Sequence, residues 1–279
     1  MVSNPLLIDR PNLSLAWAEA FLAIRAMSGH RLSPLTLSFT GLGDKAVAED
    51  ASIRFALDAA LLEAGLQKIQ TVANTIFPQA LWRIAKGDRK ELYKTYVKNL
   101  PDYVAMESSK NQRGLYFGRM VAFDVDHKTG DRLAHIPTGK VDDGNQLEFI
   151  IEHCKPRTRI SMFQAAIYDP GRDQTPAAQL GFPCLQHVTF VPNFHEKTLA
   201  LNAFYATQQL FVKGYGNYLG LARLGHFVAS QTELDLSRVT CFVGVEKMED
   251  KPHEGSLLTA LTAACQQAIG EPDVTGAQN

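Results

Sequence analysis

Apolar residues recur at helical spacing in several separate stretches of the chain. Trp17, Phe21 and Ile24 lie at positions i, i+4 and i+7, and this spacing predicts a helix over residues 13–27. Gly29 is placed to end that helix, because glycine tolerates the left-handed backbone that closes many helices. Similar patterns predict helices over residues 46–69, 90–98, 146–153 and 256–269. A further helix is predicted with Pro78 in its first turn, and another is predicted to begin at Asn217.

Alternation of apolar and polar residues predicts strands between these helices. Over residues 35–39, apolar Leu35, Leu37 and Phe39 alternate with polar residues. Strands are also predicted over residues 116–125, 184–191, 198–205 and 239–245, with an extended segment over residues 160–168. Because the elements interleave without a regular βαβ rhythm, we expect one α+β domain over residues 1–270 and a flexible polar tail over residues 271–279.

Composition and charge narrow the class of protein. The chain has 279 residues and a net charge of −1, so we expect no nucleic-acid partner. No apolar run approaches the ~20 residues that span a bilayer, and the first residues do not resemble a signal peptide. The four cysteines form no CxxC pair and no zinc spacing with histidines. We therefore expect a cytoplasmic protein without a metal.

One thiol stands at an informative point of this pattern. Cys184 follows Pro183 at the start of a predicted strand, and Asn217 follows a glycine at the start of a predicted helix. A thiolate can add to C6 of a pyrimidine, and a carboxamide can pair with the edge of the ring. Arginines suit the phosphate of a nucleotide, and the candidates are Arg31, Arg157 and Arg159.

Each of these residues also has a purely structural interpretation. A cysteine at a strand start is often a small buried hydrophobic residue. Asn217 fits the N-cap of a helix, and exposed arginines usually face solvent. The combined order of the residues favours chemistry over these separate explanations.

That order resembles the thymidylate synthase superfamily, which includes the cytidylate hydroxymethylases, from about residue 13 to about residue 250. The segments that carry the resemblance are Leu81 to Asp88, Leu115 to Arg119, Asn145 to Leu147, Arg157 to Arg159, Pro183-Cys184, and Asn217. The resemblance implies a large mixed or antiparallel sheet packed with helices, and a homodimer formed through that sheet. It implies a pyrimidine nucleotide as substrate, methylated or hydroxymethylated at C5 by 5,10-methylenetetrahydrofolate. It also implies that Arg157 and Arg159 contact phosphate in the partner's site.

Several positions depart from the family pattern. Gln79 stands where the family has its catalytic Glu, and a glutamine cannot relay a proton as a carboxylate does. Leu185 replaces the family His that follows the nucleophile. The family's Arg-containing phosphate segment reads here as Tyr205 to Gln209, and its sugar-binding segment as Gly244 to Glu249. We keep Gln79 as a catalytic candidate and Gln209 as a substrate-binding candidate.

The departures leave three functional hypotheses. In the first, the chain is a cysteine-dependent one-carbon transferase in which Glu107, Glu246 or an ordered water replaces the missing carboxylate. In the second, it is a non-catalytic nucleotide-binding or assembly protein that keeps the fold. In the third, it is a cysteine hydrolase that uses His187 or His226. We give the third hypothesis the least weight. His187 is three residues after Cys184 on the same predicted strand, and side chains three residues apart point to opposite faces.

Overall fold

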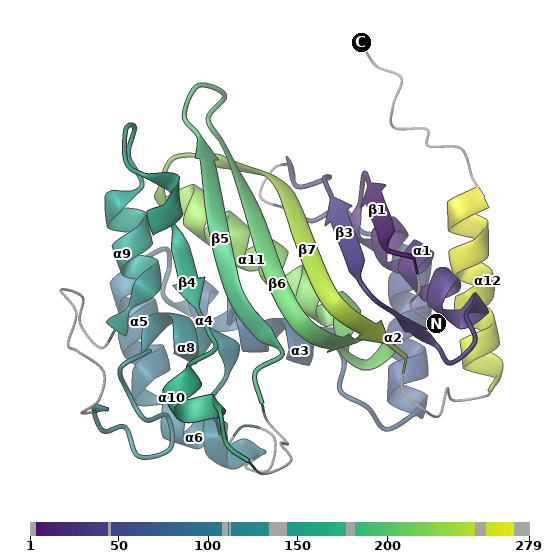
Figure 1. Cartoon of the computed structure of the whole chain (residues 1–279), viewed down its shortest axis with the longest axis horizontal. Helices are drawn as coiled ribbons and strands as arrows, with labels where there is room; N and C mark the ends of the chain where they lie inside the picture. Colours follow the sequence, from purple (N-terminus) through teal and green to yellow (C-terminus); the bar gives the residue numbers. More distant parts are fainter. Residues whose placement is uncertain are drawn as a thin grey trace.

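The structure, a computed structural model, describes residues 4–43, 46–107, 111, 113–133, 144–176, 182–248 and 255–270. Its centre is a seven-stranded sheet in the order β1-β3-β7-β6-β5-β4, with β2 paired to β7 (Figure 1). The strands are β1 (Leu6–Arg10), β2 (Arg31–Leu32), β3 (Leu35–Phe39), β4 (Gln164–Ala166), β5 (Leu185–Asn193), β6 (Thr198–Gln209) and β7 (Asp235–Lys247). β1 and β3 are parallel, as are β6 and β7, and the other neighbours are antiparallel. A mixed sheet packed with helices confirms the α+β class.

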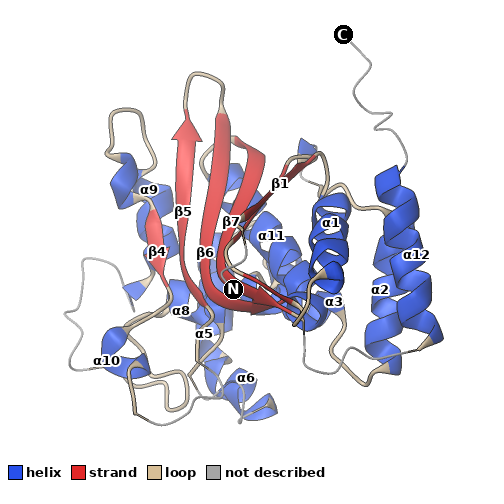
Figure 2. Ribbon diagram, turned by 45° about the vertical axis from the view of Figure 1, so that its right-hand side comes forward, coloured by secondary structure: helices blue, strands red, loops and turns tan. Residues whose placement is uncertain are grey.

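Helices cover one face of this sheet and both of its ends. They are α1 (Leu13–Ala26), α2 (Ala51–Glu63), α3 (Ile69–Ile76), α4 (Gln79–Ile84), α5 (Arg89–Lys98), α6 (Leu100–Met106), α8 (Tyr116–Val121), α9 (Gln146–His153), α10 (Pro170–Asp173), α11 (Tyr215–Gln231) and α12 (Ser256–Gly270). α11 lies behind β5, β6 and β7, while α2 and α12 stand side by side beyond β1 (Figures 1 and 2). Shorter helices surround the β4 end. No described helix crosses in front of β5, β6 and β7 in Figure 1.

α11 approaches α3 closely because two of its residues have no side chain. A Cβ added to Gly216 would lie 2.6 Å from the Cβ of Val72, and one added to Gly220 would lie 2.8 Å from the carbonyl oxygen of Ala73. Both distances are shorter than real Cβ contacts. These glycines therefore fix the depth at which α11 carries Asn217, which lies between them.

Replacing Gly216 by alanine is expected to destabilise the protein. Because the new methyl group must displace Val72 and the α3 backbone, we expect a loss of roughly 1–3 kcal/mol in the free energy of unfolding, measured with urea. Gly270→Ala is the matched control, since no atom lies within 4 Å of the added Cβ. Equal urea midpoints for the two variants would show that α3 and α11 are not held in tight contact.

The sheet has an irregularity that runs across neighbouring strands. In a regular strand, one outward-facing residue separates two buried residues. At one point in β6, in β7 and in the β2–β3 segment, two partly or fully exposed residues separate the buried ones. The buried pairs are Tyr205 and Gln208 on β6, Val243 and Glu246 on β7, and Leu32 and Leu35 on the β2–β3 segment. The strands stay in register, so that Gln208, Glu246 and Leu32 form one row. This stacked irregularity, here called the kink, turns Gln208 and Glu246 towards the helices.

The opposite side of the sheet, here called the open face, carries a row of aromatic rings. His187, Phe204 and Phe242 stand on three neighbouring strands. The ring centroids of His187 and Phe204 are 5.9 Å apart, and those of Phe204 and Phe242 are 5.5 Å apart. Phe242 keeps 39% of its surface exposed although it lies in the middle of the sheet. Partly exposed rings gathered on one sheet face mark a surface suited to contact with another protein surface.

Most predicted elements are confirmed, but three predictions are wrong. The strand predicted over residues 116–125 contains the helix α8 instead. Because all residues from Phe117 to Val121 are buried, buried and exposed positions do not alternate there, and the pattern gives no sign of a helix with one exposed face. The helix predicted over 46–69 breaks into α2 and α3 around Gly65, whose φ is +66°. The extended segment over 160–168 begins with a 3₁₀ turn over Ile160–Met162. The tail predicted over 271–279 lies outside the described residues.

Candidate functional site

Cys184 lies directly before β5 and is the only cysteine of the four that is not buried. Its backbone carbonyl accepts the N–H of Ala206 at 3.0 Å, which fixes the residue against β6. The Thr207 hydroxyl donates to its sulfur at 3.6 Å, and the thiol is 3.8 Å from the carbonyl oxygen of Phe182. Cys184 is therefore half-buried, and it packs against the hydrophobic core while its sulfur has polar neighbours. Its assignment as a nucleophile stays a prediction.

A tyrosine that the sequence did not single out also lies against this cysteine. Burial raises the pKa of Tyr116, and the neighbouring Cys184 raises it further. Hydrogen bonds from the backbone N–H groups of Leu185 and Cys184 act in the opposite direction and lower that pKa. The phenol is thus placed at the start of β5 beside the thiol. In the sequence, the only sign of this role was that Tyr116 lies in the Leu115–Arg119 segment, which resembles the family.

Asn217 is not a helix N-cap. α11 begins at Tyr215, its preceding residue is Gly214, and a π-helical turn over Leu210–Gly214 leads into it. Asn217 is the third residue of α11 and is only 4% exposed. Within the described part of the chain, its carboxamide makes no hydrogen bond. A buried amide without a protein partner is available to a ligand.

Gln79 begins α4, where its backbone N–H binds the carbonyl of Phe77 at 2.9 Å. It is half-buried. No hydrogen bond joins its side chain to Cys184 in the part of the chain that the structure describes. Its assignment as a catalytic residue stays a prediction.

Arg31 and Gln209 lie in one row at the end of the sheet. Arg31 on β2 pairs in register with Lys247 on β7, which pairs in turn with Gln209 on β6. All three side chains are exposed. Strands are ~4.8 Å apart, so the Cα atoms of Arg31 and Gln209 are separated by roughly 10 Å. Arg31 and Gln209, both predicted from the sequence to bind the substrate, therefore lie on either side of Lys247, which belongs to a segment that departs from the family pattern.

Arg157 and Arg159 follow α9 and are both exposed. Arg157 has a φ of 72°, an uncommon value for a residue with a side chain. Neither guanidinium forms an ion pair with any carboxylate of the described residues. Next to them, Ile160 keeps 53% of its surface exposed. Cations and an apolar side chain together on an exposed segment suit contact with a partner or a phosphate.

A buried polar group lies beneath the kink, on the helix side of the sheet. Its members, here called the Glu246 group, are Glu246, Gln208, Tyr205 and Tyr218, each at most 4% exposed. The Tyr218 hydroxyl donates to a carboxylate oxygen of Glu246 at 3.3 Å. Both amide atoms of Gln208 and the hydroxyl of Tyr205 lack a hydrogen-bond partner. The sequence had named Glu246 only as one of several replacement carboxylates, and it had favoured exposed Gln209 over Gln208.

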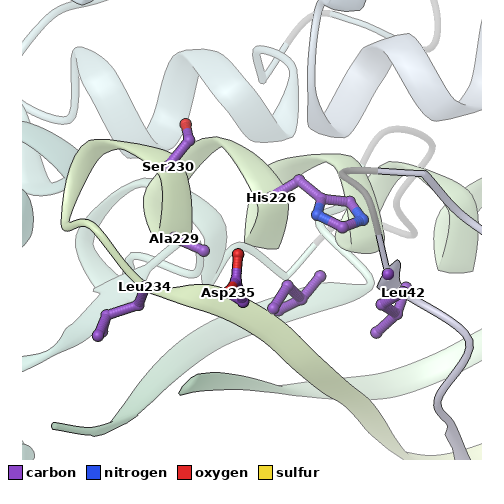
Figure 3. A pocket seen from close by; sticks show the side chains of 8 residues that line it. Leu42, His226, Ala229, Ser230, Leu234 and Asp235 are labelled. Atoms are coloured by element: carbon purple, nitrogen blue, oxygen red, sulfur yellow. The ribbon is translucent and has the colours of Figure 1, made fainter. Parts of the chain in front are cut away.

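The histidines proposed for a cysteine hydrolase are engaged elsewhere. His187 stacks on Phe204 on the open face. His226 lines a cavity of about 490 Å³ between α11, the start of β7 and the loop after β3, together with Ser230, Asp235 and several apolar residues (Figure 3). A ring nitrogen of His226 lies 3.1 Å from the carbonyl oxygen of Ala46. Neither ring has a hydrogen bond to Cys184, so the described geometry does not favour a hydrolase.

Among the described residues, no three His, Cys, Asp or Glu side chains lie close enough together to hold a metal ion. None of the described helices has the length and apolar character needed to cross a membrane.

Comparison with known proteins gives no family assignment. No family model matches the chain, and no curated protein matches it. The function must therefore be inferred from the residues themselves.

Proposed function

We propose that this chain is a thymidylate synthase-like enzyme, in which Cys184 adds to C6 of a pyrimidine nucleotide so that C5 can accept a one-carbon unit. The observation that carries the proposal is that Cys184 is half-buried, accepts from the Thr207 hydroxyl at 3.6 Å, and lies near the Tyr116 phenol. The enzyme would act in the cytoplasm.

The proposed chemistry assigns one task to each candidate residue. When the sulfur of Cys184 bonds to C6, the electrons of the C5=C6 bond move to C5 and the C4 carbonyl, which makes C5 nucleophilic. The buried carboxamide of Asn217 holds the edge of the ring. Arg31, beside Lys247, binds the phosphate from the same subunit. The one-carbon donor, 5,10-methylenetetrahydrofolate, is a second substrate here, and no described residue is assigned to it.

The proposed enzyme is a homodimer that packs through the open face. The aromatic row His187–Phe204–Phe242 lies on that face, and no described helix covers it in Figure 1. A two-fold interface uses the same patch on both subunits, and a partly exposed row of rings could form the centre of such a patch. The exposed arginines, Arg157 and Arg159, would then reach the partner's site.

Incubation with a 5-fluoropyrimidine nucleotide tests the function. Because C5 then carries fluorine instead of a hydrogen that can leave as a proton, the adduct should accumulate on the enzyme. We expect the intact mass to rise by the mass of the nucleotide when it is added alone, and by the combined masses of the nucleotide and the folate when both are added. Peptide mapping should place the adduct on Cys184. Uracil and cytosine nucleotides, each with and without the folate, define the substrate. The Cys184→Ser variant should show no adduct, and an unmodified wild-type protein under every condition would contradict the proposal.

A second candidate function is nucleotide binding without chemistry. Gln79 at the position of the family Glu favours it, since an amide cannot take up the proton that the reaction releases. This alternative predicts that nucleotides bind with equal affinity, measured by calorimetry, to the wild type and to Cys184→Ala, and that no covalent adduct forms.

A further inference from the structure

We propose that the cavity between α11 and the start of β7 binds a small organic cation. Its ammonium or guanidinium group would lie at the carboxylate of Asp235, and its hydrocarbon part would lie against the apolar residues of the cavity. This second site is separate from Cys184, so the inference does not depend on the proposed pyrimidine chemistry.

The cavity has the size of a small-molecule site. Its volume is about 490 Å³, and ligand pockets usually measure ~300–1,000 Å³. The described residues that line it come from α11, from the first part of β7 with the residue before it, and from the loop after β3 (Figure 3). On α11, His226, Ala229 and Ser230 are three and four residues apart, so they share one face of the helix. A helix face and a strand therefore enclose the site.

Apolar side chains form one part of the lining. They are Leu42, Ala229, Leu234 and Leu236, each at most 8% exposed. Leu236 is held in place by α11, because a Cβ added to Gly225 would lie only 2.7 Å from its Cδ1 atom. This apolar lining is therefore largely preformed, and it suits the hydrocarbon part of a ligand.

Two neutral polar side chains in the cavity can only accept hydrogen bonds from a ligand. One ring nitrogen of His226 lies 3.1 Å from the carbonyl oxygen of Ala46, so that nitrogen carries the hydrogen and the other keeps its lone pair. Burial lowers the pKa of His226, which keeps the ring neutral at neutral pH. The Ser230 hydroxyl donates to the carbonyl oxygen of Phe227 at 2.8 Å, which leaves its lone pairs for a ligand.

Asp235 gives the cavity its charge. Its backbone N–H donates to the carbonyl oxygen of Lys197 at 2.9 Å, which fixes the start of β7. In Figure 3 the Asp235 side chain lies between β7 and the part of α11 that carries His226 and Ala229. No residue of the described ranges forms an ion pair with this carboxylate, and no Lys or Arg is among the described residues that line the cavity.

The three polar side chains together define the class of ligand. A carboxylate, an imidazole lone pair and a hydroxyl that already donates elsewhere all require donors from the ligand. Ammonium and guanidinium groups carry several N–H donors and a positive charge, and their hydrogen bonds to a carboxylate are stronger than those of neutral groups. The cavity should therefore prefer an amine or a guanidine with an apolar body over a neutral or anionic molecule of the same shape.

The cavity lies at the opposite end of the long strands from Cys184. Asp235 pairs in register with Thr198, the first residue of β6. Cys184 binds the backbone of Ala206, eight residues further along the same strand. At ~3.3 Å per residue, roughly 26 Å separates the two places. A ligand in the cavity would contact α11, the helix that also carries Asn217, without entering the Cys184 site.

Calorimetric titration with tryptamine and tryptophol tests the charge preference. The two probes share an indole ring and differ in an ammonium or a hydroxyl group. The wild type should bind tryptamine about 10-fold more tightly than tryptophol. Asp235→Asn should weaken tryptamine binding about 10-fold and leave tryptophol binding unchanged. Asp102→Asn is the matched control, because Asp102 is an exposed carboxylate on α6 that does not line the cavity.

Reversing the charge at the same position tests whether Asp235 selects the ligand. Asp235→Lys should lose tryptamine binding and should bind 3-indolepropionate, which the wild type should not bind. Because Asp235 is exposed, both variants should keep the urea midpoint of the wild type to within the effect of a surface substitution. The inference is overturned if tryptamine shows no saturable binding to the wild type, if Asp235→Asn binds it equally well, or if Asp235→Lys keeps the wild-type preference.

Discussion

Mixing two inactive variants, Cys184→Ser and the double variant Arg157→Ala/Arg159→Ala, is expected to restore adduct formation. The first lacks the thiol, and the second lacks the arginines that we assign to the partner's site. In a mixed dimer, one site combines the Cys184 of one subunit with the arginines of the other. Random pairing of equal amounts therefore restores about a quarter of all sites in a two-fold dimer.

The single variants set the baseline for this experiment. Cys184→Ser alone should form no adduct, and loss of two charged phosphate contacts should weaken nucleotide binding by roughly 100-fold or more. A mixture of Cys184→Ser with a triple variant that lacks Cys184 and both arginines should stay inactive. Sedimentation of the mixture shows whether the protein is a dimer. If the mixture is dimeric but adduct formation is not restored, the arginines act in their own subunit's site. If the protein is a monomer, no site is shared between subunits.

Replacing Asp173 by alanine is expected to cause the largest loss of stability. Asp173 is fully buried, and its carboxylate accepts from Arg119 at 2.9 Å and from the backbone N–H of Asp169 at 2.9 Å. Arg119 is itself only 2% exposed. Without Asp173 the buried guanidinium of Arg119 would lose the carboxylate paired with it, and breaking a buried pair costs about 3–5 kcal/mol. Chemical unfolding should show this decrease directly.

An exposed ion pair in the same protein serves as the control. Arg238 and Asp9 are 2.6 Å apart, closer than the buried pair, but about half of each side chain is exposed, at 40% and 55%. Because water screens such a pair, Asp9→Ala should cost less than ~1 kcal/mol. Equal losses for the two alanine variants would show that burial does not determine the effect. Asp173→Ala should also slow adduct formation, since the pair fixes α8 and with it Tyr116.

The sequence predicted the elements that depend on local pattern. The boundaries of the helix over residues 146–153 agree with α9, and the predicted strand after Cys184 agrees with β5. It failed for α8, where Tyr116, Phe117 and Val121 favour a strand locally. There, the buried pairing of Arg119 with a residue far along the chain decides the structure.

The candidate site was predictable only in part for the same reason. Cys184 and Asn217 were chosen by their order along the chain, and their roles stay predictions. The structure adds that Thr207 donates to the Cys184 sulfur and that Asn217 is buried. Glu246 and Gln208 gain their importance from the kink, which requires matching irregularities in strands from three distant parts of the sequence. No pattern within one segment shows that Gln208, and not Gln209, turns inward.

The kink also limits how this protein can change during evolution. Single substitutions at Gln208 or Glu246 alter the chemistry beneath the sheet but leave the strands aligned. Removing one residue from β6 alone would exchange the inward and outward sides of everything beyond it, while β7 kept its own arrangement. Insertions and deletions near this row should therefore be tolerated only when neighbouring strands change together, so relatives of this chain should differ here in residue type and hardly ever in strand length.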